Sequence, residues 1–238
     1  MALKMPRLVI VTASAINGVM LPILSREYDK GNLVKCNEYI GHVLSVLIYI
    51  LFPCGCFLFF MAPEIVIVLF GESFVGGIIT LRIASLLIFT LGFSNLFGTQ
   101  LLLISGNERK LLFCTVIGAI SNIILNLVLI PKYQNNGAAI ASVISELLVT
   151  IAALYHSKRI FSFFINKKCL YSSIISCFFL CVVIFVSKVE IDNYVLKLLT
   201  AITLGGVIYF FVNWILKNPV VLIMHTVVLD YIKKNKNS

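Results

Sequence analysis

The residues best placed to do chemistry are polar side chains inside long apolar stretches. A single carboxylate, Glu146, lies near the middle of the apolar run 137–156, and Asn122 and Asn126 lie one helical turn apart in the run 111–130. Ionisable groups are costly in lipid, so a carboxylate at this depth is protonated, paired or facing water. We interpret Glu146 as part of a substrate cavity or a coupling-ion site. A structural contact with the neighbouring asparagines is the alternative.

A second group of polar residues lies in the apolar run 77–104. Asn95 and Thr99 are four residues apart and share one face of a helix, with Gln100 beside them. Arg82 near the start of the run either extends to the lipid headgroups or faces a cavity, where its guanidinium would hold a phosphate. The amides either join helices to one another or line a cavity. The candidate cavity residues are Arg82, Asn95, Gln100, Asn122, Asn126 and Glu146.

Enzymes, metal proteins and nucleic-acid-binding proteins are disfavoured by what accompanies these residues. His42, His156 and His225 are scattered, without a paired carboxylate or metal-ligand spacing. The seven cysteines fall mostly in apolar runs, where small core residues are expected. The net charge of +9 is typical of basic cytoplasmic loops in a membrane protein. We therefore predict no catalytic residue, no bound metal, no cofactor and no nucleic-acid partner.

The elements that must position the candidate residues are membrane-spanning helices. The chain has 238 residues, is 60% hydrophobic and only 12% charged, with a mean hydropathy of +1.04, so lipid must be its solvent. The sequence predicts an all-α polytopic bundle of about seven spans followed by an interfacial cytoplasmic tail at 217–238, for which a frayed tail is the alternative. The expected spans are 6–24, 39–61, 77–104, 111–130, 137–156, 169–187 and 195–216.

The orientation follows from the loop charges. Most lysines and arginines fall in the segments 25–38, 105–110, 157–168 and 217–238, which we therefore place on the cytoplasmic side together with the C-terminus. The N-terminus is then outside, although Lys4 and Arg7 should favour the cytoplasm. This conflict suggests that the first span is an interior helix of a longer protein.

Several strings resemble, in order and spacing, the C-terminal half of Wzx-type O-antigen flippases, which belong to the multidrug/oligosaccharidyl-lipid/polysaccharide exporter superfamily. They include Phe70-Gly71-Glu72-Ser73-Phe74, Leu81-Arg82-Ile83-Ala84-Ser85, Gly92 to Gly98, Gly118 to Asn126, Ile130-Pro131-Lys132-Tyr133 and Gly137 to Glu146. The resemblance implies a two-lobed alternating-access bundle, with residues 1–160 forming helices of the C-terminal lobe and 161–216 two additional helices. Such proteins are about twice this length, so we expect the chain to be truncated.

The resemblance also implies a substrate and a role for each candidate residue. The protein would flip undecaprenyl-pyrophosphate-linked oligosaccharide, such as O-antigen repeat units, across the bacterial cytoplasmic (inner) membrane. Arg82 would attract the phosphates, the amides would bond sugar hydroxyls, and Glu146 would respond to a coupling cation, H⁺ or Na⁺. Further expected partners are membrane lipids and the polysaccharide polymerase machinery.

Three alternatives stay open beside the flippase. A drug/cation antiporter of the same superfamily is disfavoured by the polysaccharide-type strings. A membrane enzyme of polysaccharide assembly is disfavoured because the outward loops offer few acidic residues to handle a metal and a sugar nucleotide. A non-transporting membrane fragment or subunit is the third alternative.

Overall fold

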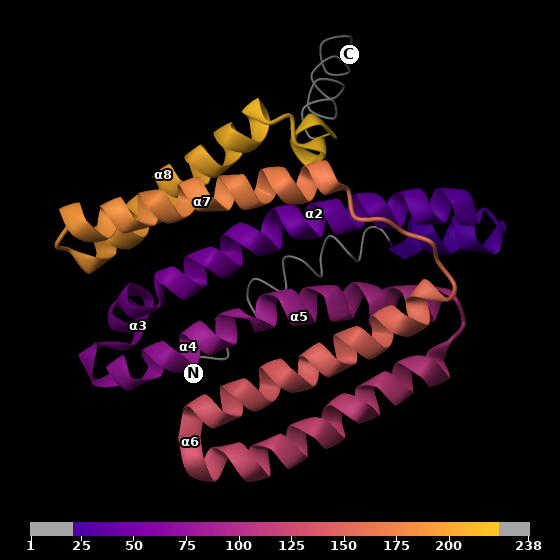
Figure 1. Cartoon of the computed structure of the whole chain (residues 1–238), viewed down its shortest axis with the longest axis horizontal. Helices are drawn as coiled ribbons and strands as arrows, with labels where there is room; N and C mark the ends of the chain where they lie inside the picture. Colours follow the sequence, from indigo (N-terminus) through magenta and orange to yellow (C-terminus); the bar gives the residue numbers. More distant parts are fainter. Residues whose placement is uncertain (1–20, 224–238) are drawn as a thin grey trace, which may run out of the picture.

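The computed structural model describes residues 21–223 as a bundle of helices (Figure 1). A short helix over 21–29 precedes the first element with defined bounds. The elements are α2 (Leu33–Phe60), α3 (Ala62–Phe70), η1 (Glu72–Gly77), α4 (Ile78–Ser85), α5 (Leu87–Ser94), η2 (Asn95–Leu102), α6 (Glu108–Lys158), α7 (Lys167–Glu190) and α8 (Tyr194–Ile215).

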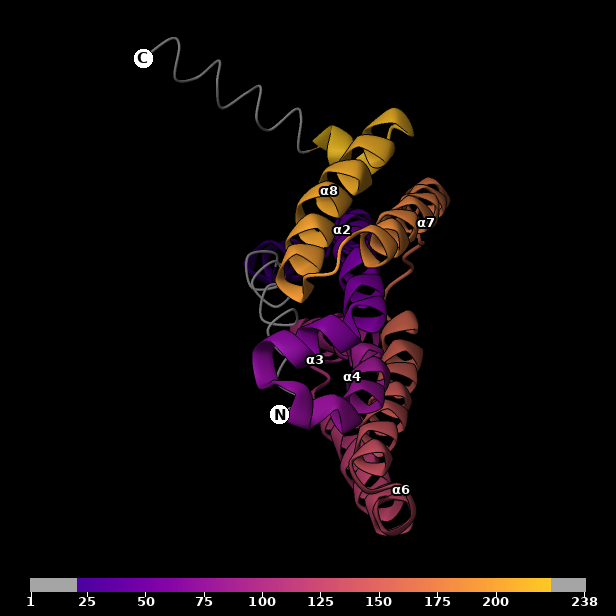
Figure 2. The same cartoon turned by 90° about the vertical axis from the view of Figure 1, so that its left-hand side faces the viewer.

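Helix α2 lies in the middle of the bundle (Figures 1 and 2). It packs against α7 on one side and against α4 and α5 on the other, and α6 covers the far side of α4, α5 and η2. Leu44, Leu47 and Leu51 of α2 are fully or almost fully buried in the core. The large apolar residues of the outer helices are instead exposed, as expected of surfaces that face lipid.

Element α6 is two helices joined by a sharp turn. Gln134 has a φ of 49° and a ψ of −124°, which is not helical. A straight helix of 51 residues would be about 77 Å long, far more than the roughly 30 Å hydrocarbon core of a bilayer. Figure 1 shows the resulting hairpin, whose first half runs over residues 108–133 and whose second half runs over 135–158.

Three hydrogen bonds attach the second half of α6 to the broken helix formed by α4, α5 and η2. Thr80 Oγ1 donates to Asn136 Oδ1 over 2.6 Å. Thr150 Oγ1 shares its hydrogen between the carbonyl of Thr90, at 2.9 Å, and the carbonyl of Glu146 in its own helix, at 2.7 Å. Ser157 Oγ donates to the carbonyl of Phe97 over 2.6 Å. The bonds lie near the start, the middle and the end of this half, so they determine how it is aligned with its neighbour.

Buried polar contacts hold α8 to α2 and to α7. The Tyr209 hydroxyl donates to the carbonyl of Tyr49 over 2.8 Å. Asn218, just after α8, donates to Ser172 Oγ of α7 and to Asn213 Oδ1 of α8, both over 2.7 Å. Such bonds replace the water that these groups would have outside a membrane.

The all-α fold class is confirmed. Within residues 21–223, five helical segments are long and apolar enough to cross a membrane, and one of them is the α6 hairpin. The expected spans 39–61, 169–187 and 195–216 coincide with α2, α7 and α8, and 77–104 coincides with the segment from η1 to η2. The expected spans 111–130 and 137–156 fall in the two halves of α6. Most of the first expected span, 6–24, and the tail beyond residue 223 lie outside the described residues.

Candidate functional site

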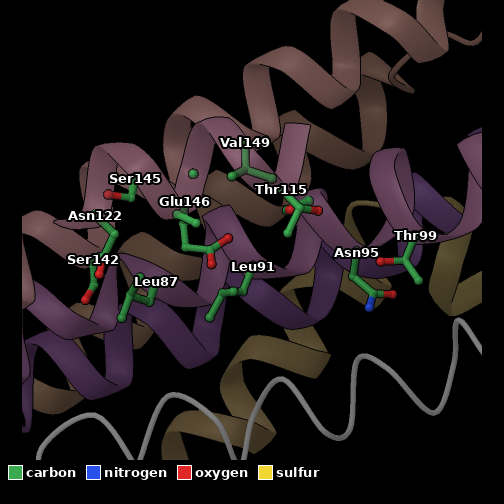
Figure 3. A pocket seen from close by; sticks show the side chains of 13 residues that line it. Leu87, Leu91, Asn95, Thr99, Thr115, Asn122, Ser142, Ser145, Glu146 and Val149 are labelled. Atoms are coloured by element: carbon green, nitrogen blue, oxygen red, sulfur yellow. The ribbon is translucent and has the colours of Figure 1, made fainter. Parts of the chain in front are cut away.

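A cavity of about 600 Å³ lies between three helical segments: α5 with η2, the first half of α6 and the second half of α6 (Figure 3). Leu87, Leu91 and Val149 supply apolar walls. The polar part of the lining consists of hydroxyls, amides and one carboxylate. These residues are Ser94, Asn95, Thr99, Thr115, Asn122, Ser142, Ser145 and Glu146.

Glu146 lies in the middle of this lining. Figure 3 shows Asn122 and Ser142 toward one end of the cavity and Asn95 and Thr99 toward the other. The side chain of Glu146 is half-buried, and within residues 21–223 its carboxylate makes no ion pair and no hydrogen bond. A carboxylate in this state is available to a ligand, because its desolvation is not offset by a protein partner.

Asn122 and Asn126 are bonded to each other. Asn126 Nδ2 donates to Asn122 Oδ1 over 2.8 Å, as expected of amides four residues apart on one helix. Asn122 lines the cavity, whereas Asn126 lies outside its lining. The buried Oδ1 of Asn126 has no hydrogen-bond partner in the described part of the chain. The pair therefore orients the Asn122 amide toward the cavity and leaves one acceptor unused.

The geometry of η2 explains the relation between Asn95 and Gln100. Residues 95–102 form a π-helix, whose i to i+5 hydrogen bonding places residues five apart over one another. Gln100 Nε2 lies 3.5 Å from Asn95 Oδ1, a long hydrogen bond across this spacing. Gln100 is itself buried and does not line the cavity, so its contact with Asn95 is a supporting one. Short π-helical segments are rare and are often found at functional sites.

The structure brings together three of the six residues predicted for the cavity. Asn95, Asn122 and Glu146 line it, and Gln100 and Asn126 each lie behind one of them. Arg82 is not part of this site. It lines a separate cavity of about 360 Å³ beside Phe60 and Lys188. Helical spacing agrees with this separation, because Arg82 and Asn95 are 13 residues apart and would lie on nearly opposite faces of a regular helix.

Sequence reasoning undervalued the hydroxyls around Glu146. Thr150 lies one helical turn after Glu146, but its hydroxyl contacts α5, while Ser145 lines the cavity. The Ser142 and Ser145 hydroxyls donate to the carbonyls of Ala138 and Ala141 of their own helix. Their oxygen lone pairs are therefore free to accept from, or to coordinate, a ligand in the cavity. Ser145 and Val149 are four residues apart and therefore share one face of the helix, and this spacing could have identified them from the sequence.

Electrostatics decide what this cavity can bind. Glu146 is the one ionisable side chain among the described lining residues. Carboxylate, hydroxyl and amide oxygens are the ligands that hard cations prefer, and an ionised Glu146 would repel a phosphate. The arrangement is suited to a proton or a small cation rather than to an anionic headgroup.

A second cavity, of about 490 Å³, lies between α2, α7 and α8. Its walls are almost entirely apolar and include Pro53, Phe57, Leu180 and Ile202. Such a surface suits a hydrocarbon chain and has no means of binding a charged group.

Spanning helices packed around a half-buried carboxylate cavity define a multi-pass membrane protein with a transporter fold. The fold is similar to that of a solved structure described as "Lipid II flippase MurJ, inward closed conformation", with a TM-score of 0.72 and 18% sequence identity over 90% of this chain and 46% of that one. The family profile described as "Lipid II flippase MurJ" matches residues 3–216. The chain belongs to the MurJ lipid II flippase family.

Two relatives come from Methanocaldococcus jannaschii. The uncharacterized membrane protein MJ1068 is 26% identical over 199 residues, which are 83% of this chain and 38% of the relative. The uncharacterized membrane protein MJ1375 is 30% identical over 155 residues, which are 62% of this chain and 34% of the relative. The chain thus spans less than half the length of these two relatives and of the solved structure.

The family match confirms several expectations at the level of class. The protein is a multi-pass membrane protein, and its family consists of flippases of lipid-linked precursors, which are transporters and not enzymes. The superfamily expected from the sequence strings is confirmed as well. The matching branch is the MurJ family, whereas the strings had suggested the Wzx-type O-antigen branch.

Proposed function

We propose that this chain forms a cation-coupled lobe of a flippase that moves a lipid-linked oligosaccharide across the cytoplasmic membrane. The observation that carries the proposal is the Glu146 carboxylate, which lies in a three-helix cavity without a protein partner in the described residues. Membership of a flippase family supplies the transported class. Glu146 binds the coupling cation, H⁺ or Na⁺, and Asn95 and Asn122 contribute oxygens.

Occupancy of this cavity by a cation biases the packing of three helices. The two halves of α6 and the α5–η2 segment all contribute side chains to the lining, so a bound cation draws their oxygens together. An empty, ionised site leaves a negative charge between apolar walls, which favours water entry or separation of the helices. A cation with different affinities for two arrangements of these helices shifts their populations, as alternating access requires.

The substrate that we infer is an undecaprenyl-pyrophosphate-linked glycan. The family match favours lipid II, and the sequence strings favour an O-antigen repeat unit; both are glycan precursors carried on a lipid. The apolar cavity between α2, α7 and α8 fits the hydrocarbon tail. The bacterial inner membrane, a cytoplasmic C-terminus and contact with polysaccharide polymerase belong to the same proposal.

The proposal is tested by translocation in proteoliposomes. The chain is reconstituted with a fluorescent lipid-linked oligosaccharide, and the fraction of label that an impermeant quencher reaches is followed with and without a proton or sodium gradient. We expect the gradient to change the translocation rate of the wild type. Glu146→Gln removes the charge but keeps the size, so this variant should lose the response to the gradient.

Glu108→Gln is the matched control, because Glu108 is an exposed carboxylate in the first turn of the same element. It should retain the wild-type response. Binding of radioactive sodium, or proton release on binding, is measured on the same samples. A Glu146→Gln variant with the same gradient response and the same cation binding as the wild type would contradict the proposal.

A further inference from the structure

The cavity that contains Arg82 has a different chemistry from the one around Glu146. It measures about 360 Å³ and lies between the end of α2, α4 and α7. Phe60, Phe178 and Phe185 form apolar walls, and Arg82 and Lys188 bring two cationic groups to the same space. No residue is shared between the two cavities.

Only one of these two cations is neutralised. Lys188 Nζ lies 3.1 Å from Glu64 Oε1 and donates to the carbonyl of Phe60 over 2.6 Å. Glu64 is 5% exposed and lies behind Lys188, outside the cavity lining. The Arg82 guanidinium has no ion pair within residues 21–223, so this cavity carries an excess positive charge.

The surroundings of Arg82 leave its hydrogen-bonding capacity unused. Its Nε is buried and has no hydrogen-bond partner in the described part of the chain. The guanidinium makes a cation–π contact with the ring of Phe59, with 5.9 Å between Cζ and the ring centroid. A guanidinium has five donors in a planar fork that matches the oxygens of a phosphate.

The geometry points to a binding site for the phosphate-bearing headgroup of a lipid, held by Arg82 with Lys188 beside it. Phe178 and Phe185 are 65% and 69% exposed on the same helix, where they present an apolar surface to the chains of such a lipid. An anion at Arg82 uses its free donors and compensates the excess charge. A membrane phospholipid and a polyprenyl phosphate share this chemistry. The site does not depend on the proposed transport function.

The experiment measures lipid binding to the purified chain by native mass spectrometry. The probes are phosphatidylglycerol, undecaprenyl phosphate and phosphatidylcholine, whose phosphate is already paired with its own choline. Arg82→Gln should weaken binding of the anionic lipid roughly tenfold or more, because charge-assisted hydrogen bonds are lost. Arg82→Lys keeps the positive charge but not the planar set of guanidinium donors, so its loss of lipid binding should be smaller than that of Arg82→Gln.

The control is Arg109→Gln, which removes an exposed arginine at the start of α6 and should leave binding unchanged. Circular dichroism checks that the variants keep the wild-type helix content, and Arg82→Lys retains the test if Arg82→Gln is unfolded. Arg82-dependent binding of phosphatidylglycerol assigns the site to membrane phospholipid, and Arg82-dependent binding of undecaprenyl phosphate alone assigns it to a lipid carrier. Equal binding of both anionic lipids to wild type and the Arg82 variants, or an equal loss in Arg109→Gln, overturns the inference.

Discussion

Lys188 of α7 and Glu64 of α3 form an ion pair, with 3.1 Å between Nζ and Oε1. Glu64 follows Pro63 in the first turn of α3. Within residues 21–223 the Lys188 ammonium pairs with no other carboxylate, and it also donates to the carbonyl of Phe60 at the end of α2. One side chain thus connects α7 to the corner between α2 and α3. The Glu64 carboxylate is almost fully buried, so loss of the pair would leave an uncompensated charge at this corner.

Lys188→Met should destabilise the protein by about 1–3 kcal/mol, because it leaves the buried Glu64 carboxylate without its counter-charge. The double variant Glu64→Gln/Lys188→Met should recover most of the loss, since no charge is then buried. Thermal unfolding in detergent, followed by circular dichroism, measures both effects. Lys132→Met, at an exposed lysine, is the control. A double variant less stable than Lys188→Met would contradict the explanation.

Gly118→Ala should destabilise the α6 hairpin by about 1–3 kcal/mol through overpacking. A methyl group at Gly118 would clash with Cγ2 of Val149 on the facing half of α6. In a Val149→Ala background the same change should be nearly neutral, because the clashing methyl is gone. A double-mutant cycle of unfolding free energies isolates this coupling. Gly76→Ala, where a methyl group meets nothing within 4 Å, should have little effect and serves as the control.

Thr150→Val should lower the free energy of unfolding by about 1 kcal/mol, because the hydroxyl shared between the carbonyls of Thr90 and Glu146 is lost while the side-chain shape is kept. Hydrogen exchange should also rise in the second half of α6 and in α5. The control is Thr203→Val, whose exposed hydroxyl donates only within α8. Equal effects of the two substitutions would show that the contact between α6 and α5 contributes nothing special.

Gln134→Gly should stabilise the protein by about 0.5–1 kcal/mol. The φ of 49° at Gln134 lies in the left-handed region, where a side chain is strained and glycine is not. The greater flexibility of glycine in the unfolded chain offsets part of the gain. Gln134→Ala keeps a Cβ and should stay close to the wild type. Thermal unfolding of the three proteins gives their order of stability. A Gln134→Gly variant less stable than Gln134→Ala would contradict the explanation that the backbone at Gln134 is strained.

The membrane class and the approximate positions of the helices could be predicted from the sequence. Long apolar runs have few structural solutions in lipid, so α2, α7 and α8 appear close to their expected bounds. Two separate spans at 111–130 and 137–156 were also predicted, and the structure joins them by a turn at Gln134. The choice of Glu146 as a candidate cavity residue followed from the same reasoning, since one carboxylate in an apolar span is costly.

The grouping of the candidate residues was decided only by the tertiary structure. Arg82, Asn95 and Glu146 looked like parts of one cavity, but Arg82 and Asn95 are 13 residues apart and lie on nearly opposite faces of their helical segment. Arg82 consequently joins Lys188 of a distant helix, and Asn95 joins Glu146. The sequence by itself determined that polar groups must be buried among apolar helices, because the types of these residues and their depth in the apolar runs set the energetic cost of exposing them to lipid. Which of them meet depends on helix rotation and packing, and these are set by contacts between residues far apart in the chain.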